Sequence, residues 1–161
     1  MKNRNIILIL SIGLLLFSSC ITTSYVPRQS GMIKTMPKGY QRENEFYKRG
    51  IFKGGIINAV KDDEKALRYA KRSSSNAKTA FGLLWGGWAI SFTGMVMGVA
   101  SSQGKPTYNA GMAMFYGGLL PVFLSLIPSA NSWGYEFDAV NAYNDNFLQK
   151  NAPQVFDKMK K

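Results

Sequence analysis

Residues 78–105 read KTAFGLLWGGWAISFTGMVMGVASSQGK, and no residue between the two lysines carries a formal charge. A second uncharged stretch begins directly after Lys105 and continues to Glu136. Each stretch exceeds the roughly 20 residues that a helix needs to cross the hydrocarbon core of a bilayer. The sequence therefore predicts two membrane-crossing helices, near residues 80–101 and 109–131.

The connection between these two segments is short. Residues 102–107 read SQGKPT, a turn-forming composition that makes the two helices antiparallel neighbours. Pro121 and Pro128 lie in the second segment and are expected to kink that helix or to end it early. The alternative is a water-soluble protein with a two-helix apolar core, although the rest of the chain offers little to cover two helices that are apolar on all faces.

Small residues recur every seven positions in both apolar segments. They are Ala80, Gly87, Gly94 and Ser101 in the first segment, and Gly111, Gly118, Ser125 and Ser132 in the second. Seven residues make two helical turns, so each set lies on one helix face and lets two backbones approach closely in lipid. Gly82 with Gly86, and Gly94 with Gly98, add pairs at four-residue spacing. The stripes predict close packing within the hairpin, and contacts between copies of the chain are the alternative use of these glycines.

A short apolar run near the start of the chain ends at its only cysteine, Cys20. Lys2 and Arg4 precede the run, and residues 17–19 read FSS. A positive start, an apolar core and small residues before a cleavage point are typical of a secretory signal. This layout resembles the signal of bacterial prolipoproteins, with Phe17 where that class usually has leucine. The resemblance implies cleavage after residue 19 and a triacyl anchor, palmitate included, at Cys20. An uncleaved anchor with an incidental cysteine is the alternative.

The resemblance also bears on localisation. In prolipoproteins of two-membraned bacteria, an aspartate just after the lipidated cysteine commonly retains the protein in the inner membrane. Here that position is Ile21, so the resemblance implies a lipoprotein of the bacterial envelope, with the outer membrane favoured over the inner one. Charge bias opposes this export, because basic segments tend to remain in the cytoplasm, but a signal peptide acts first.

Basic residues concentrate between the cysteine and the first apolar helix. Residues 28–78 carry thirteen Lys or Arg against five acidic residues, whereas residues 133–161 carry four of each. A basic segment beside a bilayer attracts anionic lipid headgroups, and an ordinary solvated face is the alternative. Nucleic acid, the other common partner of such charge, does not suit a lipoprotein that faces away from the cytoplasm.

The basic segment also carries weak signals of regular structure. Short β-favouring pieces at residues 32–33, 45–47 and 51–52 predict a small hairpin or meander. Residues 59–78 predict an amphipathic helix that Asp62 or Asp63 caps.

The tail from residue 133 is expected to form a second amphipathic helix, which Pro153 ends. Trp133 and Tyr135 suit the headgroup zone at the exit of a membrane helix. The helix carries an apolar stripe of Phe137, Val140, Phe147 and Leu148, and a polar group of Asp138, Asn141, Asn144 and Asp145. The polar group could hold a partner, and a solvated face is the ordinary alternative.

Together these segments predict a mainly α fold. Its parts are a signal peptide (1–19), a lipidated tether (20–31), a small basic extramembrane module (32–78), a membrane helical hairpin (79–132) and a C-terminal amphipathic helix with its tail (133–161). An amphipathic helix flanks the hairpin on each side, and the module contains a small β hairpin.

The composition restricts the chemistry. The chain has no histidine, the side chain that most often binds zinc and moves protons near neutral pH, and lipid would occupy Cys20, so Cys/His chemistry is excluded. The sequence lacks a phosphate loop, a dinucleotide motif and metal-ligand spacing, and we expect no cofactor.

The leading hypothesis is a non-catalytic envelope lipoprotein with a structural or interaction role, which binds membrane lipid and associates with itself or with a membrane protein. One alternative is a small exclusion or immunity protein that packs against a foreign membrane protein. Another is an enzyme that acts on lipid or cell wall through Ser or Asp.

Overall fold

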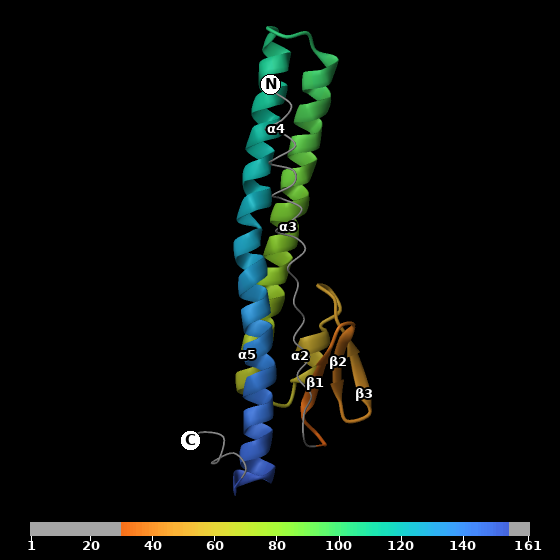
Figure 1. The fold of residues 1–161 in the computed structure, drawn as a ribbon, viewed down its shortest axis with the longest axis vertical. Coiled ribbons are helices and arrows are strands. Elements are labelled where there is room, and N and C mark those ends of the chain that lie inside the picture. The colour runs from red at the N-terminus through yellow and green to blue at the C-terminus, as the bar shows by residue number, and fades with distance from the viewer. Residues whose placement is uncertain (1–29, 155–161) are drawn as a thin grey trace, which may run out of the picture.

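A computed structural model describes residues 30–154 of the chain, so the expected signal peptide, Cys20 and most of the tether lie outside the described residues. The element order is β1 (Ile33–Met36), β2 (Gly39–Arg42), β3 (Glu45–Lys48), α2 (Gly55–Ala59), α3 (Glu64–Ala100), α4 (Pro106–Leu124) and α5 (Leu126–Asn151). The three long helices form an extended antiparallel hairpin, and the sheet and α2 pack beside the end far from its turn (Figure 1). The mainly helical fold with an antiparallel hairpin is confirmed.

Helix α3 spans what the sequence suggested were two helices. It runs for 37 residues, about 55 Å at 1.5 Å per residue. Asp63 caps it as predicted, because its carboxylate accepts a hydrogen bond from the Ala66 amide at 2.9 Å. The expected boundary near residue 78 is wrong. Asn76 and Thr79 occur there, but their side chains donate to carbonyls four residues earlier within the same helix and do not break it.

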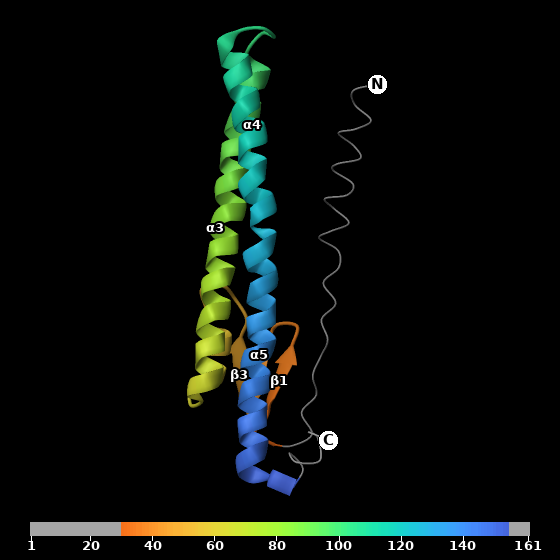
Figure 2. The same ribbon diagram turned by 90° about the vertical axis from the view of Figure 1, so that its left-hand side faces the viewer.

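The returning arm is also nearly continuous. Only Ser125 separates α4 from α5, and its φ of −63° and ψ of −20° are helical, so the chain keeps its direction (Figure 2). The expected limits of 109–131, and a separate tail helix from residue 133, are therefore wrong. Pro121 and Pro128 both lie inside helices. The Ser125 amide donates to the Pro121 carbonyl at 2.9 Å, and the helical bonding resumes at once. Helix α5 ends at Asn151, just before Pro153, as predicted.

The sheet has three antiparallel strands in the order β1-β2-β3. Met36 pairs with Gly39 and Arg42 pairs with Glu45, so each connection is a tight turn. The expected strand at residues 51–52 is wrong, because these residues form a turn after β3. The middle strand β2 was not anticipated, because it is four residues long and begins with a glycine.

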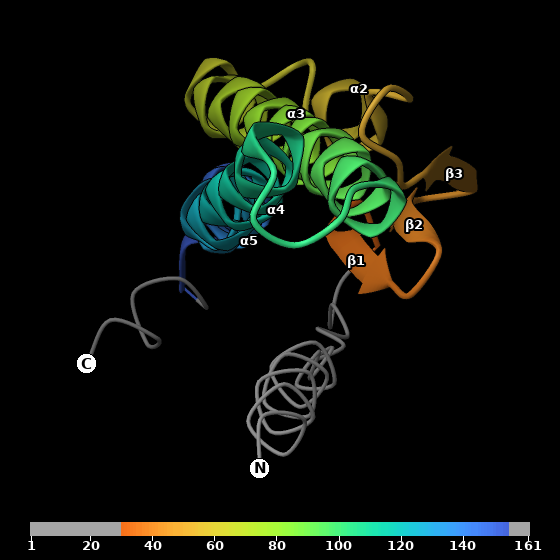
Figure 3. The ribbon, with the colours of Figure 1, turned by 90° about the horizontal axis from the view of Figure 1, so that it is seen from above.

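Figure 3 looks along the helices and shows α2 and the sheet on one side of the helix pair, with α2 beside α3. The sheet, α2 and the ends of α3 and α5 share one hydrophobic core. Its buried residues come from β1, β2, α2, α3 and α5, with Val60 directly after α2: Ile33, Tyr40, Ile56, Ala59, Val60, Ala66, Ala70, Ala139 and Val140. The small sheet is thus stabilised by the ends of α3 and α5, as a ribbon of this size requires.

Asn144 of α5 fixes the sheet to the hairpin. Its Oδ1 accepts a hydrogen bond from the Ile33 amide at 2.7 Å, and its Nδ2 donates to the Ile33 carbonyl at 3.2 Å. The side chain is buried and its hydrogen bonds are used, so Asn144 does not belong to the exposed polar group expected from the sequence. The expected apolar stripe also differs. Val140 and Leu148 are buried, but Phe137 is 40% exposed.

Candidate functional site

Helices α3 and α4 pack backbone against backbone. A Cβ atom added at Gly94 would lie 2.5 Å from the Gly111 carbonyl oxygen and closer still to the Phe115 amide nitrogen. At Gly87 it would lie 2.6 Å from the Gly118 carbonyl oxygen. Real Cβ atoms essentially never approach other atoms within 3.0 Å, so these positions have no room even for alanine.

The structure buries most of the seven-residue stripe, and its four glycines lie at this contact. Six of the eight stripe residues are buried: Gly87, Gly94, Gly111, Gly118, Ser125 and Ser132. The other two are half-buried: Ala80 lies in α3, and Ser101 directly follows its last residue. Gly98 is also buried, with the Met112 sulfur 3.5 Å from an added Cβ. Gly82 and Gly86 differ, because nothing lies within 4 Å of a Cβ at either position.

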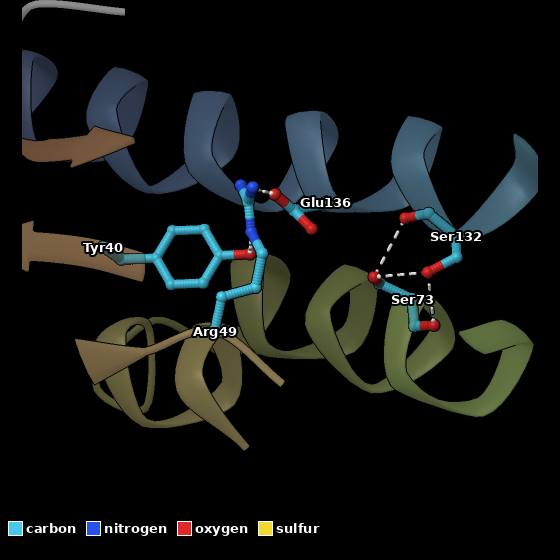
Figure 4. A network of polar contacts seen from close by, with 5 residues as sticks. All are labelled: Tyr40, Arg49, Ser73, Ser132 and Glu136. Atoms are coloured by element: carbon cyan, nitrogen blue, oxygen red, sulfur yellow. Dashed lines mark hydrogen bonds and ion pairs between the residues drawn. The ribbon is translucent and has the colours of Figure 1, made fainter. Parts of the chain in front are cut away.

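Serine hydroxyls join the two arms at points between these glycines. Ser91 Oγ donates to the Phe115 carbonyl at 2.9 Å. Nearer the sheet, Ser73 Oγ donates to the Ser132 carbonyl at 2.9 Å, and Ser132 Oγ donates to the Ser73 carbonyl at 3.0 Å (Figure 4). Neither Ser73 nor Ser91 was expected at this contact from the sequence. A signal was present, because Ser73 lies seven residues before Ala80 and Ser91 lies four residues after Gly87.

The outer surface of the hairpin is apolar. Large exposed apolar side chains occur along α3 from Phe81 to Val99 and along the returning arm from Tyr116 to Ile127, and we call them the apolar belt. Both arms are long and apolar enough to cross a membrane by length and composition. Only 22% and 17% of the residues in their most apolar windows are buried. Residues 30–154 therefore provide no cover of the kind that a water-soluble two-helix core needs.

A second group of side chains gathers where the sheet meets the hairpin. Arg49, which follows β3, places Nη2 2.5 Å from Glu136 Oε1 on α5 and donates from Nε to the Tyr40 hydroxyl at 3.3 Å (Figure 4). Its guanidinium also lies over the rings of Tyr40 and Trp133, at 5.2 and 5.7 Å from their centroids. Arginine is suited to such a position, because its planar group bonds at its edge and stacks through its faces.

The surroundings fix the charge states of this group. Burial raises the pKa of Tyr40 far above its ordinary value, and the negative charge of Glu136 raises it further, so the phenol stays neutral. Burial alone would lower the pKa of Arg49, but its bonds to Tyr40 and Glu136 outweigh burial and raise it. The group is therefore one neutral phenol and one ion pair.

A cavity of about 190 Å³ lies beside this ion pair, and we call it the junction cavity. Polar parts of its wall come from Arg49, Glu136 and the Ser73–Ser132 pair, and apolar parts include Ile57 and Trp133. Sequence reasoning did not find this site, because Arg49 and Glu136 are 87 residues apart and neither lies in a recognisable motif. Within residues 30–154, no three Asp, Glu, His or Cys side chains are close enough together to hold a metal ion.

Comparison with known proteins finds no matching family model, no matching curated sequence and no matching solved structure. The fold itself defines a coarse class. The chain is a mainly helical protein, in which a long antiparallel hairpin with an apolar exterior carries a three-stranded sheet at one end. Its apolar arms indicate membrane association.

Proposed function

We propose that this chain is a non-catalytic, membrane-anchored envelope lipoprotein with a structural or interaction role. The observation that carries the proposal is the apolar belt, which leaves bulky side chains such as Trp85, Phe92 and Phe123 at least half exposed. Soluble proteins rarely expose apolar patches of more than a few hundred Å² unless these bind a partner or a membrane. Lipid is the partner that covers all sides of a hairpin.

The dimensions of the belt support insertion. From Phe81 to Ala100, α3 covers roughly 20 residues, about 30 Å, which is the thickness of a bilayer hydrocarbon core. Lys78 lies just outside one end and Lys105 lies in the turn at the other, so neither charge has to enter the hydrocarbon. Trp133, beside the sheet, suits the headgroup layer.

The small-residue contact has a physical role in this setting. Lipid tails are as apolar as the helices, so no hydrophobic force drives the two arms together once both are inserted. Close backbone contact at Gly87, Gly94, Gly111 and Gly118, together with hydroxyl bonds such as that of Ser91, supplies the attraction. The sheet and its basic residues then lie at the membrane surface.

Anchoring by Cys20 would add a second attachment. A single acyl chain binds a membrane only marginally, whereas two or more signals bind stably.

The test is metabolic labelling with a radiolabelled fatty acid, comparing the native chain with Cys20→Ala, followed by membrane fractionation and a urea wash at neutral pH. We expect label only in the native chain, and both chains in the membrane pellet after the wash because the hairpin remains. Labelling of Cys20→Ala would refute the lipidation. Release of Cys20→Ala by urea would refute the insertion, because only the hairpin holds that variant in the membrane. Outer-membrane fractions are expected to hold the native chain.

A second candidate function is supported by the outward face of α3. Gly82 and Gly86 leave an open strip beside the exposed ring of Trp85, and neither glycine contacts the hairpin's other arm. Another membrane helix could pack closely there, as an exclusion or immunity protein would require. Crosslinking in membranes distinguishes the possibilities. A foreign membrane protein joined to the native chain, and lost in Gly86→Leu, favours this candidate, whereas a complex of this chain alone favours a structural role.

A further inference from the structure

We propose that the junction cavity binds the headgroup of a zwitterionic phospholipid with a primary ammonium group, such as phosphatidylethanolamine. The phosphate lies on Arg49 and the ammonium on Glu136. This inference rests on the proposed membrane insertion, which places the cavity at the level of the lipid headgroups.

The ion pair has unused hydrogen-bonding capacity. Arg49 uses Nη2 for Glu136 and Nε for Tyr40, and its Nη1 has no hydrogen-bond partner among residues 30–154. Glu136 accepts from Arg49 at Oε1 and faces the Tyr40 hydroxyl, and its Oε2 accepts no hydrogen bond from that part of the chain. A phosphate oxygen accepts from Nη1, and an ammonium donates to Oε2, so a zwitterion bonds to both groups without breaking the pair.

The charges of the wall select a zwitterion over an anion. Arg49 and Glu136 are the only charged residues among those that line the cavity, so its formal charge is zero. An anionic headgroup such as phosphatidylglycerol would gain Arg49 but meet the carboxylate of Glu136 with nothing to offset it.

The cavity has the size of a headgroup, and part of its wall adjoins the apolar belt. Its volume of about 190 Å³ holds the equivalent of roughly six water molecules at 30 Å³ each, which is room for a phosphoethanolamine group but not for acyl chains. Ile51 and Ala77 form apolar parts of its wall. Next to Ile51, Phe52 is 73% exposed and packs edge-on against Phe81, with ring centroids 5.6 Å apart. The loop that holds Phe52 extends toward the hairpin turn (Figure 1), so the acyl chains pass along these two rings into the bilayer.

The test uses the full-length lipidated protein in mild detergent, mixed with equal amounts of phosphatidylethanolamine, phosphatidylglycerol and phosphatidylcholine. Native mass spectrometry then measures how much of each lipid stays bound. We expect one phosphatidylethanolamine per chain, retained about tenfold over the other two, because a hydrogen bond to a charged group contributes that much discrimination. Phosphatidylcholine is disfavoured because its ammonium has no N–H to donate.

Two variants test the roles proposed for Glu136 and Arg49. Glu136→Gln gives the wall a net positive charge, so phosphatidylglycerol should replace phosphatidylethanolamine as the preferred lipid. Arg49→Gln should retain about tenfold less phosphatidylethanolamine and about tenfold less phosphatidylglycerol than the native chain. Matched controls are Asp138→Asn and Arg72→Gln, which remove the same charges from exposed positions outside the cavity and should behave as the native chain.

Three outcomes would overturn the inference: preference of the native chain for phosphatidylglycerol, equal retention of all three lipids, or unchanged selectivity in Glu136→Gln. If Arg49→Gln fails to fold, the lipid selectivities of the native chain and of Glu136→Gln still test the proposed headgroup site. A urea wash of the membranes separates this failure from that of the proposed function. If Cys20→Ala resists urea but the native chain shows no headgroup selectivity, only the headgroup site is refuted, whereas release of Cys20→Ala by urea refutes both.

Discussion

Replacing Gly94 by alanine adds one methyl group at the closest approach of α3 and α4. The methyl carbon would begin 2.5 Å from the Gly111 carbonyl oxygen and closer still to the Phe115 amide nitrogen, so the α4 backbone must retreat by more than about 0.9 Å to reach the 3.4 Å of an ordinary contact. The obstructing atoms are backbone, so no side chain can move aside. Overpacking of this kind costs about 1–3 kcal/mol. The shift also weakens the Ser91–Phe115 hydrogen bond, worth about 1 kcal/mol. We expect Gly94→Ala to lose about 2–4 kcal/mol of unfolding free energy.

The assay is reversible unfolding in mixed micelles of a mild detergent and SDS, followed by tryptophan fluorescence. Gly86→Ala is the matched control on the same helix, because its methyl group meets nothing within 4 Å. It should be neutral or slightly stabilising, since alanine favours helix by up to about 1 kcal/mol over glycine. Gly98→Ala is the sharper comparison. Gly98 is buried, but the added carbon would lie at an ordinary 3.5 Å from the Met112 sulfur, so this variant should be tolerated. If Gly94→Ala is as stable as the other two, the account of the contact is wrong.

Three further changes address the module beside the hairpin. Asn144→Ala leaves the buried Ile33 amide and carbonyl without partners and should cost about 2–4 kcal/mol, seen as faster proteolysis of the sheet than of the helices. Asp63→Ala removes the cap of α3 and should lower the unfolding free energy of the module by about 0.5–2 kcal/mol in a thermal melt followed by circular dichroism. The raised pKa of Tyr40 means that the folded state holds its phenol proton more tightly than the unfolded state. The contribution of Tyr40 to stability should therefore be level below pH of about 10 and fall above it, and Tyr40→Phe should reduce the loss of stability in alkaline denaturation.

Each of these has its own control. Asn141→Ala changes an exposed asparagine on the same helix and should leave proteolysis unchanged. Asp62→Ala should have a smaller effect than Asp63→Ala, because Asp62 pairs with Arg42 at 2.7 Å but does not cap the helix. If the alkaline transition is the same in Tyr40→Phe as in the native chain, groups other than Tyr40 cause the pH dependence. If Asp62→Ala and Asp63→Ala lower the melting temperature equally, the cap has no special role.

The helical part of the fold could be predicted because its signals are local. Two uncharged stretches, the turn at residues 102–107 and the capping aspartate each act within a few residues, and the structure has the corresponding helices and cap. Helix ends were harder to predict. The boundary expected near residue 78 reflected a change from polar to apolar composition, but a helix continues through such a change unless glycine, proline or a competing cap stops it.

One part of the candidate site could likewise be predicted from the sequence, and another part could not. The seven-residue stripe could be read because a helix repeats its faces at a fixed period, and the structure places Gly87, Gly94, Gly111 and Gly118 at the contact. The junction cavity could not be read. Nothing near Tyr40 or Arg49 in the sequence indicates that both face Glu136, because that depends on how far α5 extends past the hairpin and on where the sheet packs against it.

The sequence by itself determined that this chain forms two long apolar helices joined by a tight turn, since charge, length and period are properties of each segment alone. Only the tertiary structure decided which residues meet across the chain: Ser73 with Ser132, Arg49 with Glu136, and Ile33 with Asn144, the last pair 111 residues apart. The physical reason is the register of the two arms. It is set by the sum of many close contacts along the hairpin, and a displacement of one turn would bring different residues together at the sheet.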